Sequence, residues 1–110
     1  MKKADHSTDR GSITRFQQIV NVGPAFEEDF RVLGIKSPQG LIGRDPWQLY
    51  RKLCTKTKTF HDPCVLDTFL AIVDFMNGNP PKIWWKYTSK RKSEYSQKVE
   101  KLKKQLQRAD

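Results

Sequence analysis

Residues 61–78, HDPCVLDTFLAIVDFMNG, form the most apolar run of the sequence and decide the fold. Asp62 can cap a helix with its short side chain, and Pro63 suits the first helical position, where its missing N–H costs nothing. Gly78 is suited to the left-handed backbone that ends many helices. Eight large apolar side chains between these signals cover most of the helix circumference, which is typical of a helix covered on several sides. We therefore expect a central helix in a small, all-helical domain.

The chain has 110 residues, which is enough for one domain with a real core. Its net charge of +9 is unevenly spread, because residues 80–110 carry 10 basic and 3 acidic side chains. Residues 13–79 are nearly neutral, with 8 basic and 7 acidic side chains. A basic appendage on a neutral body favours an anionic partner such as nucleic acid.

The N-terminus has two lysines but no apolar run behind them, so we expect no signal peptide. No apolar segment approaches the roughly 20 residues that a membrane span needs. Two cysteines without a secretion signal indicate free thiols in a reducing compartment. These features predict a cytoplasmic protein that does not contact membranes.

Residues 1–12 are polar and without periodicity, and we expect them to form a disordered tail. Apolar residues at helical spacing over 13–20 predict a first helix. Asn21 and Gly23 both suit a left-handed turn, and Pro24 opens a second helix that ends at Gly34. The connection is short enough to require a tight reversal between two helices.

Further helices follow along the chain. Ser37-Pro38 indicates a short helical turn, and Asp45-Pro46 opens a helix that gives way to a basic polar loop over 55–59. Pro80-Pro81 ends the central helix, and residues 82–88 are expected to be irregular or extended. Residues 89–110 form a basic helix docked by a narrow apolar stripe, which consists of Tyr95, Val99, Leu102 and Leu106.

The segment IVNVGPAF, residues 19–26, resembles the hairpin of helix-hairpin-helix proteins. Ile19, Val22, Gly23 and Pro24 match the apolar-x-x-apolar-Gly-Pro core of that hairpin. In that module, backbone amides at a helix start face phosphate oxygens, and the helix dipole favours the anion.

A longer pattern extends the resemblance over residues 13–91: NVGPAF…LGI…GRDPWQLYRKLC…HDPCVLDTFLAIVDF…P-x-x-WWK. It is similar to the pathogenicity-locus family, small bacterial helix-hairpin-helix proteins that are also called mitomycin-resistance proteins. A looser similarity reaches the C-terminal domain of competence regulators. The resemblance implies a DNA-binding role and an all-α fold: a compact domain of five to six helices, with paired helix-hairpin-helix-like units over residues 13–88.

The hairpin departs from the form that binds DNA. Asn21 replaces the usual first glycine, and Ala25 replaces a frequent lysine. Acidic residues at 27–29 suit the helix dipole but repel an incoming phosphate. The turn is therefore either a phosphate site or only a structural corner between two helices, and the sequence leaves both interpretations open.

Two other groups of residues have alternative interpretations. Cys54, His61, Asp62 and Cys64 lie within eleven residues, but the spacing lacks the paired ligands of zinc sites, and buried structural thiols are favoured. Trp84-Trp85, beside Lys86, can stack on single-stranded nucleic acid or close the core, and core closure is favoured, with one ring buried and one partly exposed.

The leading hypothesis is a monomeric, non-enzymatic protein that binds DNA without sequence preference and without a cofactor, since no catalytic motif is found. The alternatives are an adaptor whose acidic hairpin is covered by a protein partner and, less favoured, a Cys/His metal or thiol protein. The candidate nucleic-acid-binding residues are Asn21, Gly23, Ala25, Lys82, Lys86, Lys90, Arg91, Lys92, Lys98 and Lys101.

Overall fold

The computed structural model describes residues 2–108, and this part of the chain is all-helical, without a β-strand. The α-helices are α1 (Pro24–Val32), α2 (Pro46–Thr57), α3 (Cys64–Met76) and α4 (Thr88–Arg108). Four short 3₁₀ turns complete it: η1 (Arg10–Ser12), η2 (Phe16–Gln18), η3 (Pro38–Leu41) and η4 (Trp84–Tyr87). The all-α prediction is confirmed, with four α-helices in place of the expected five or six.

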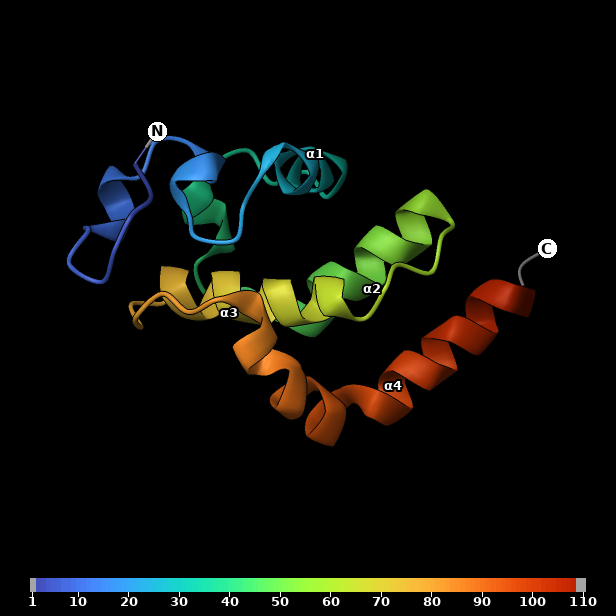
Figure 1. Cartoon of the computed structure of the whole chain (residues 1–110). Helices are drawn as coiled ribbons and strands as arrows, with labels where there is room; N and C mark the ends of the chain where they lie inside the picture. Colours follow the sequence, from blue (N-terminus) through green and yellow to red (C-terminus); the bar gives the residue numbers. More distant parts are fainter. Residues whose placement is uncertain (1, 109–110) are drawn as a thin grey trace.

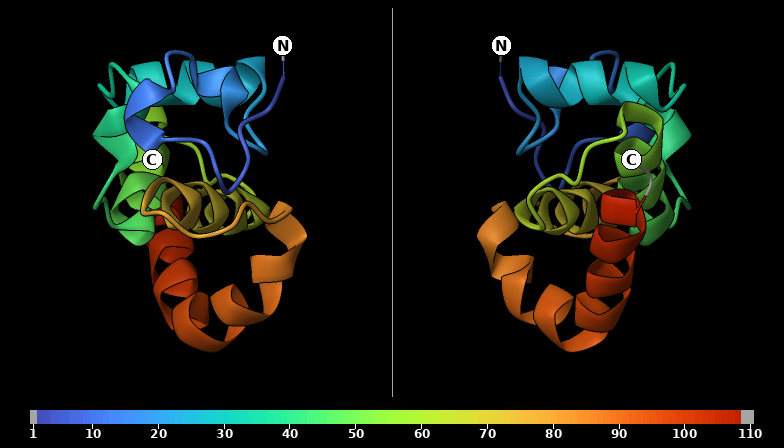
Figure 2. Two further views of the ribbon diagram at one scale, coloured as in Figure 1. Left: turned by 90° about the vertical axis from the view of Figure 1, so that its left-hand side faces the viewer. Right: turned by 90° about the vertical axis from the view of Figure 1, so that its right-hand side faces the viewer.

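The elements are arranged around α3 (Figure 1). The N-terminal segment and α1 lie on one side of it, α2 packs beside it, and η4 and α4 lie on the other side. Figure 2 shows that the chain leaves α3, descends through η4 and turns at a corner into α4. The molecule measures 44 × 27 × 21 Å. The last two residues of the predicted C-terminal helix lie outside the described residues.

The predicted central helix is present as α3. The Asp62 carboxylate accepts a hydrogen bond of 2.9 Å from the Cys64 amide and so caps the helix start. Gly78, with φ of +105°, follows the helix end. Phe69 is fully buried between the rings of Phe26 and Phe30, at centroid distances of 5.3 and 6.2 Å. The apolar circumference therefore packs on several sides, as its composition predicts.

Asp67, a polar interruption in that apolar run, is fully buried in the structure. Its carboxylate accepts hydrogen bonds from the Thr88 hydroxyl at 2.7 Å and from Arg91 Nε at 2.8 Å. A buried carboxylate must have such partners, because an unpaired charge is costly to remove from water. Asp67 thus fixes the first turn of α4 to the first turn of α3.

The prediction of a first helix over residues 13–20 is wrong. This segment holds only the 3₁₀ turn η2, flanked by extended residues. The Gln18 side chain accepts hydrogen bonds from the Thr14 and Arg15 amides and so caps this short 3₁₀ turn. The buried residues of the segment also recur at a spacing of three, which suits 3₁₀ geometry better than an α-helix; they are Ile13, Phe16, Ile19 and Val22. The expected helix-hairpin-helix pairing is not confirmed, because η2 stands where its first helix would lie.

Two further boundaries differ from the prediction. α2 continues to Thr57, whose hydroxyl bonds to the Leu53 carbonyl, and left-handed Lys58 ends it, so the loop expected over 55–59 is shorter. Residues 84–87 form η4 and lead directly into α4 at Thr88, so this part is not extended.

Residues 3–10, here called the N-terminal strap, pack on the body of the protein, in contrast to the expected disordered tail. The Lys3 ammonium donates to the carbonyls of Gln17 at 2.5 Å and Val22 at 2.7 Å. Arg10 donates to the Phe75 carbonyl at 2.7 Å and lies 4.0 Å above the Phe75 ring. The hydrogen bonds to carbonyls hold a polar segment that has few apolar side chains of its own.

Candidate nucleic-acid interface

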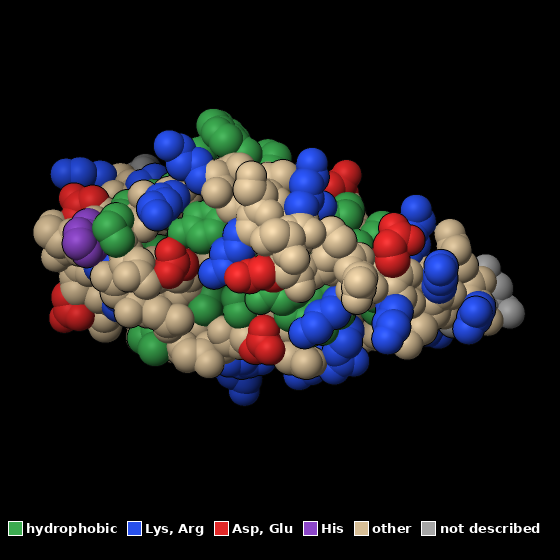
Figure 3. Space-filling view, turned by 90° about the horizontal axis from the view of Figure 1, so that it is seen from below, with side chains coloured by type: hydrophobic (Ala, Val, Ile, Leu, Met, Phe, Trp, Pro, Cys, Tyr) green, Lys and Arg blue, Asp and Glu red, His purple; other side chains and the backbone are tan. Residues whose placement is uncertain are grey.

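α4 has a narrow buried side and a broad exposed, basic side. Val99 and Leu102 are buried, and Tyr95 and Leu106 pack partly against the core, which confirms the docked stripe. Sequence separations of 11, 3 and 4 residues, all close to whole turns, align a row of exposed basic side chains on the outer side: Lys90, Lys101, Lys104 and Arg108. Figure 3 shows Lys and Arg side chains on this face and along the projecting end of the molecule.

The basic residues of α4 have few acidic partners. Two ion pairs occur within residues 2–108, namely Glu28–Arg31 and Asp67–Arg91. Seven of the eight basic side chains of α4 therefore make no ion pair with this part of the chain. Their charge faces solvent and is available to an anionic partner.

Arg91 differs from the other predicted site residues. Its side chain is only 16% exposed, and its guanidinium binds the buried Asp67 carboxylate. It serves to attach α4, so it is poorly placed to reach a phosphate. Lys90, Lys92, Lys98 and Lys101 are exposed, as the sequence interpretation requires.

A groove between α2 and α4 brings three basic side chains together: Arg51, Lys98 and Lys101. Trp47 and Leu102 line its apolar part, and the Lys98 ammonium lies 5.8 Å from the centre of the Trp47 ring. Sequence analysis missed Arg51. Its place on the exposed side of α2 can be read from periodicity, but its closeness to α4 depends on the tertiary packing.

The hairpin turn is held by bonds within the protein. Asn21 carries the left-handed backbone, with φ of 78°, and its side chain donates to the Lys82 carbonyl at 2.8 Å and accepts from the Trp84 amide at 3.1 Å. Gly23 has an ordinary extended backbone, with φ of −111°, so the positive φ expected there is wrong. One hydrogen bond donated and one accepted by the Asn21 side chain thus serve to hold the turn within the protein.

The start of α1 keeps features of an anion site. Gly23, which precedes it, makes no side-chain cap, and Ala25 in the first turn is exposed. The first amides of a helix have no acceptor within the helix. Among the acidic residues that follow, Glu27 accepts a hydrogen bond from Gln17 Nε2 at 2.6 Å, and Glu28 forms an ion pair with Arg31 at 3.3 Å.

Lys82 and Lys86 lie exposed on either side of the two tryptophans. Trp84 is half-buried and Trp85 is 58% exposed, so one ring is exposed as expected, but the other is not fully buried in the core. The hairpin turn contacts this segment through the Asn21 side chain.

Comparison with known proteins places this arrangement in a family. The Cdd1 family, described as "Pathogenicity locus", matches residues 9–93. The chain belongs to the pathogenicity-locus family. The mitomycin resistance protein McrB of Streptomyces lavendulae is 39% identical over 74 residues, which cover 67% of this chain and 70% of that protein. No solved structure matches the chain.

The family match extends from the end of the N-terminal strap to the second turn of α4. In this pathogenicity-locus protein, the basic row at Lys101, Lys104 and Arg108 therefore lies beyond the matched region. No helix within residues 2–108 is long and apolar enough to cross a membrane.

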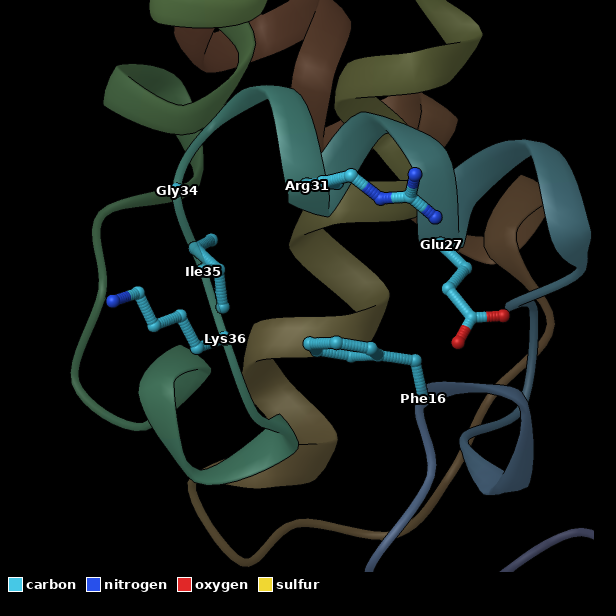
Figure 4. A pocket seen from close by; sticks show the side chains of 6 residues that line it. All are labelled: Phe16, Glu27, Arg31, Gly34, Ile35 and Lys36. Atoms are coloured by element: carbon cyan, nitrogen blue, oxygen red, sulfur yellow. The ribbon is translucent and has the colours of Figure 1, made fainter.

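A pocket of about 340 Å³ lies beside the hairpin of this pathogenicity-locus protein (Figure 4). Phe16 lies at its floor, and Glu27 and Arg31 project from α1. The Lys36 side chain points away from the Phe16 ring. Charges of both signs surround it, so it has no clear preference for an anion.

Both cysteine thiols of this pathogenicity-locus protein have raised pKa values. Cys54 is fully buried, and burial raises the pKa of its thiol. Burial, aided by the neighbouring Asp62 carboxylate, raises the pKa of Cys64 to about 11. Both thiols are therefore protonated near neutral pH and are poor nucleophiles. No three His, Cys, Asp or Glu side chains of residues 2–108 lie close enough together to hold a metal ion.

Proposed function

We propose that this pathogenicity-locus protein is a non-enzymatic DNA-binding protein that holds phosphates through the exposed basic side of α4. The observation that supports this best is the set of seven basic side chains on α4 without an ion-pair partner in residues 2–108. Such a concentration of unpaired charge on one helix is the electrostatic footprint of a phosphate-binding surface. DNA in the bacterial cytoplasm is the partner that this charge fits.

The geometry of α4 supports contacts without sequence preference. Its 21 residues extend about 31 Å at 1.5 Å per residue. Long lysine side chains along this length can reach several phosphates in succession, and phosphate contacts carry no direct sequence information. Arg51 and Lys98 add positive charge where α2 meets α4.

A salt titration of DNA binding tests the proposal. Each phosphate contact contributes about 0.9 to the slope of log K against log salt. Replacing Lys101, Lys104 and Arg108 by Gln should weaken duplex binding and reduce that slope by up to about 2.7, regardless of DNA sequence. The matched control replaces Lys36, Lys56 and Lys58 by Gln, which removes the same charge from exposed sites outside α4 and should change the slope less.

Equal slopes for the two triple variants would show that α4 is not the contact surface. Absence of binding by the natural chain at low salt would overturn the DNA proposal. The adaptor hypothesis, in which a protein partner covers the hairpin, would then take its place.

We also propose that the chain contributes to mitomycin resistance, because its relative of 39% identity is named for that resistance. Expression in a mitomycin-sensitive bacterium should raise the drug concentration that stops growth. If DNA binding underlies this effect, the α4 variant should protect less than the control variant. Equal sensitivity with and without the natural chain would refute the proposal.

A further inference from the structure

Trp85 is one of the two large apolar residues that residues 2–108 leave exposed, and the other is Ile42. The exposed fraction of Trp85 is 58%, compared with 47% for Ile42. A single exposed apolar residue is common in soluble proteins, so exposure alone assigns no role. The surroundings of Trp85 set it apart.

The backbone around Trp85 is fixed on both sides. The Asn21 side chain holds the Lys82 carbonyl and the Trp84 amide, and the Lys86 amide donates to the Ile83 carbonyl at 3.1 Å. Two residues after Trp85 in the sequence, Tyr87 is buried, and its hydroxyl donates a hydrogen bond of 2.5 Å to the Asp74 carboxylate. The η4 turn is therefore a rigid support for the exposed ring.

The Trp85 ring itself has a defined neighbour. The rings of Trp84 and Trp85 meet edge to face, with centroids 5.7 Å apart and planes at 84°. Trp84 is half-buried and so supports its exposed neighbour. A pre-positioned aromatic ring loses less freedom on binding than a mobile one.

The charge around this ring is positive. Lys82, Lys86 and Lys90 are exposed, and no acidic residue occurs between residues 80 and 93. An exposed aromatic ring beside a row of lysines is the combination that binds single-stranded nucleic acid, since bases stack on the ring while cations follow the backbone. The bases of a duplex already stack on one another and offer no free face in its interior.

We propose that Trp85 stacks on an unpaired base, so that single-stranded DNA is bound at η4 and the first turn of α4 in addition to the duplex contacts. The proposal rests on the DNA-binding function for its electrostatic part. The stacking part is independent of that function, because it depends on one aromatic side chain and on no charge.

Fluorescence anisotropy with a labelled 20-nucleotide oligo-dT and a blunt duplex of equal length tests the stacking. Trp85→Ala should weaken oligo-dT binding by about five-fold to a hundred-fold, from the range of base–aromatic stacking. The salt slope should stay unchanged, because no charge is lost. Trp85→Phe should retain part of the affinity, and Ile42→Ala, which removes the other exposed apolar side chain, should have no effect.

The outcomes separate the two proposals. If Trp85→Ala leaves oligo-dT binding unchanged, or weakens duplex binding equally, the stacking proposal is overturned, while salt-dependent duplex binding still supports the proposed function. If the natural chain binds neither DNA, both proposals fail. Because Trp85 is exposed, the variant should unfold at the same urea concentration as the natural chain, and this measurement shows that a lost affinity is not a lost fold.

Discussion

At the scale of single residues, Asn21 is the most informative position of the hairpin. It adopts the left-handed backbone and joins the turn to residues 82 and 84 through its side-chain amide. The tolerance of asparagine for that backbone is predictable from the sequence. Its partners lie 61 and 63 residues away, so no local pattern can reveal them. Asn21 was therefore predicted as a DNA-binding residue, whereas in the structure its side chain joins the hairpin turn to residues 82 and 84.

Ala25 offers a test of the other interpretation of the turn. Ala25→Glu places a carboxylate in the first turn of α1, where it should stabilise the helix by about 0.3–1 kcal/mol. If the amides there hold a phosphate, DNA affinity at low salt should fall by about three-fold to ten-fold. The measurements are urea denaturation and anisotropy, with Ala25→Gln as the neutral control. Unchanged affinity would identify the turn as a structural corner.

At the scale of elements, α4 is part of the domain and not a detachable basic arm. Thr88 and Arg91 bind Asp67, and Val99 and Leu102 are buried. Removing residues 89–110 would therefore uncover the core as well as remove charge. The stripe on α4 was predictable from its spacing, because apolar periodicity indicates which side is buried. The burial of Asp67 was not predictable, because the sequence does not show which helix supplies the cation that pairs with it.

The attachment of α4 can be tested at Asp67. Asp67→Asn should leave Arg91 partly buried without its counter-charge and cost about 3–5 kcal/mol in free energy of unfolding. Urea denaturation measures this loss. Arg31→Ala is the control, since it breaks the exposed Glu28 pair and should cost less than about 1 kcal/mol. Similar losses in the two variants would contradict the anchoring role of Asp67.

At the scale of the whole molecule, the N-terminal strap joins parts that are distant in sequence. Lys3 binds carbonyls of the hairpin, and Arg10 binds the carbonyls of Phe75, at the end of α3, and of Asn79, after it. Polar composition predicts disorder for such a segment, because it has little apolar surface to bury. Hydrogen bonds from charged side chains to backbone carbonyls are the competing interaction, and these cannot be predicted from composition.

Arg10→Ala tests whether the strap contributes to stability. The change removes the bonds to the Phe75 and Asn79 carbonyls and the contact with the Phe75 ring. We expect a loss of about 1–3 kcal/mol in free energy of unfolding, because two carbonyls lose a charged donor. Arg10→Lys should recover part of it, since lysine keeps the charge without the planar fork. A loss below about 0.5 kcal/mol would support the disordered tail instead.

The position of Arg10 also matters during synthesis of the chain on the ribosome. Its acceptor at Phe75 follows 65 residues later, which takes about 3–13 s at usual translation rates. Until then the strap can reach the hairpin through Lys3 but has no α3 on which to close. The strap is thus secured only well after its own synthesis, and a nascent chain halted before residue 75 should leave the strap open to proteases.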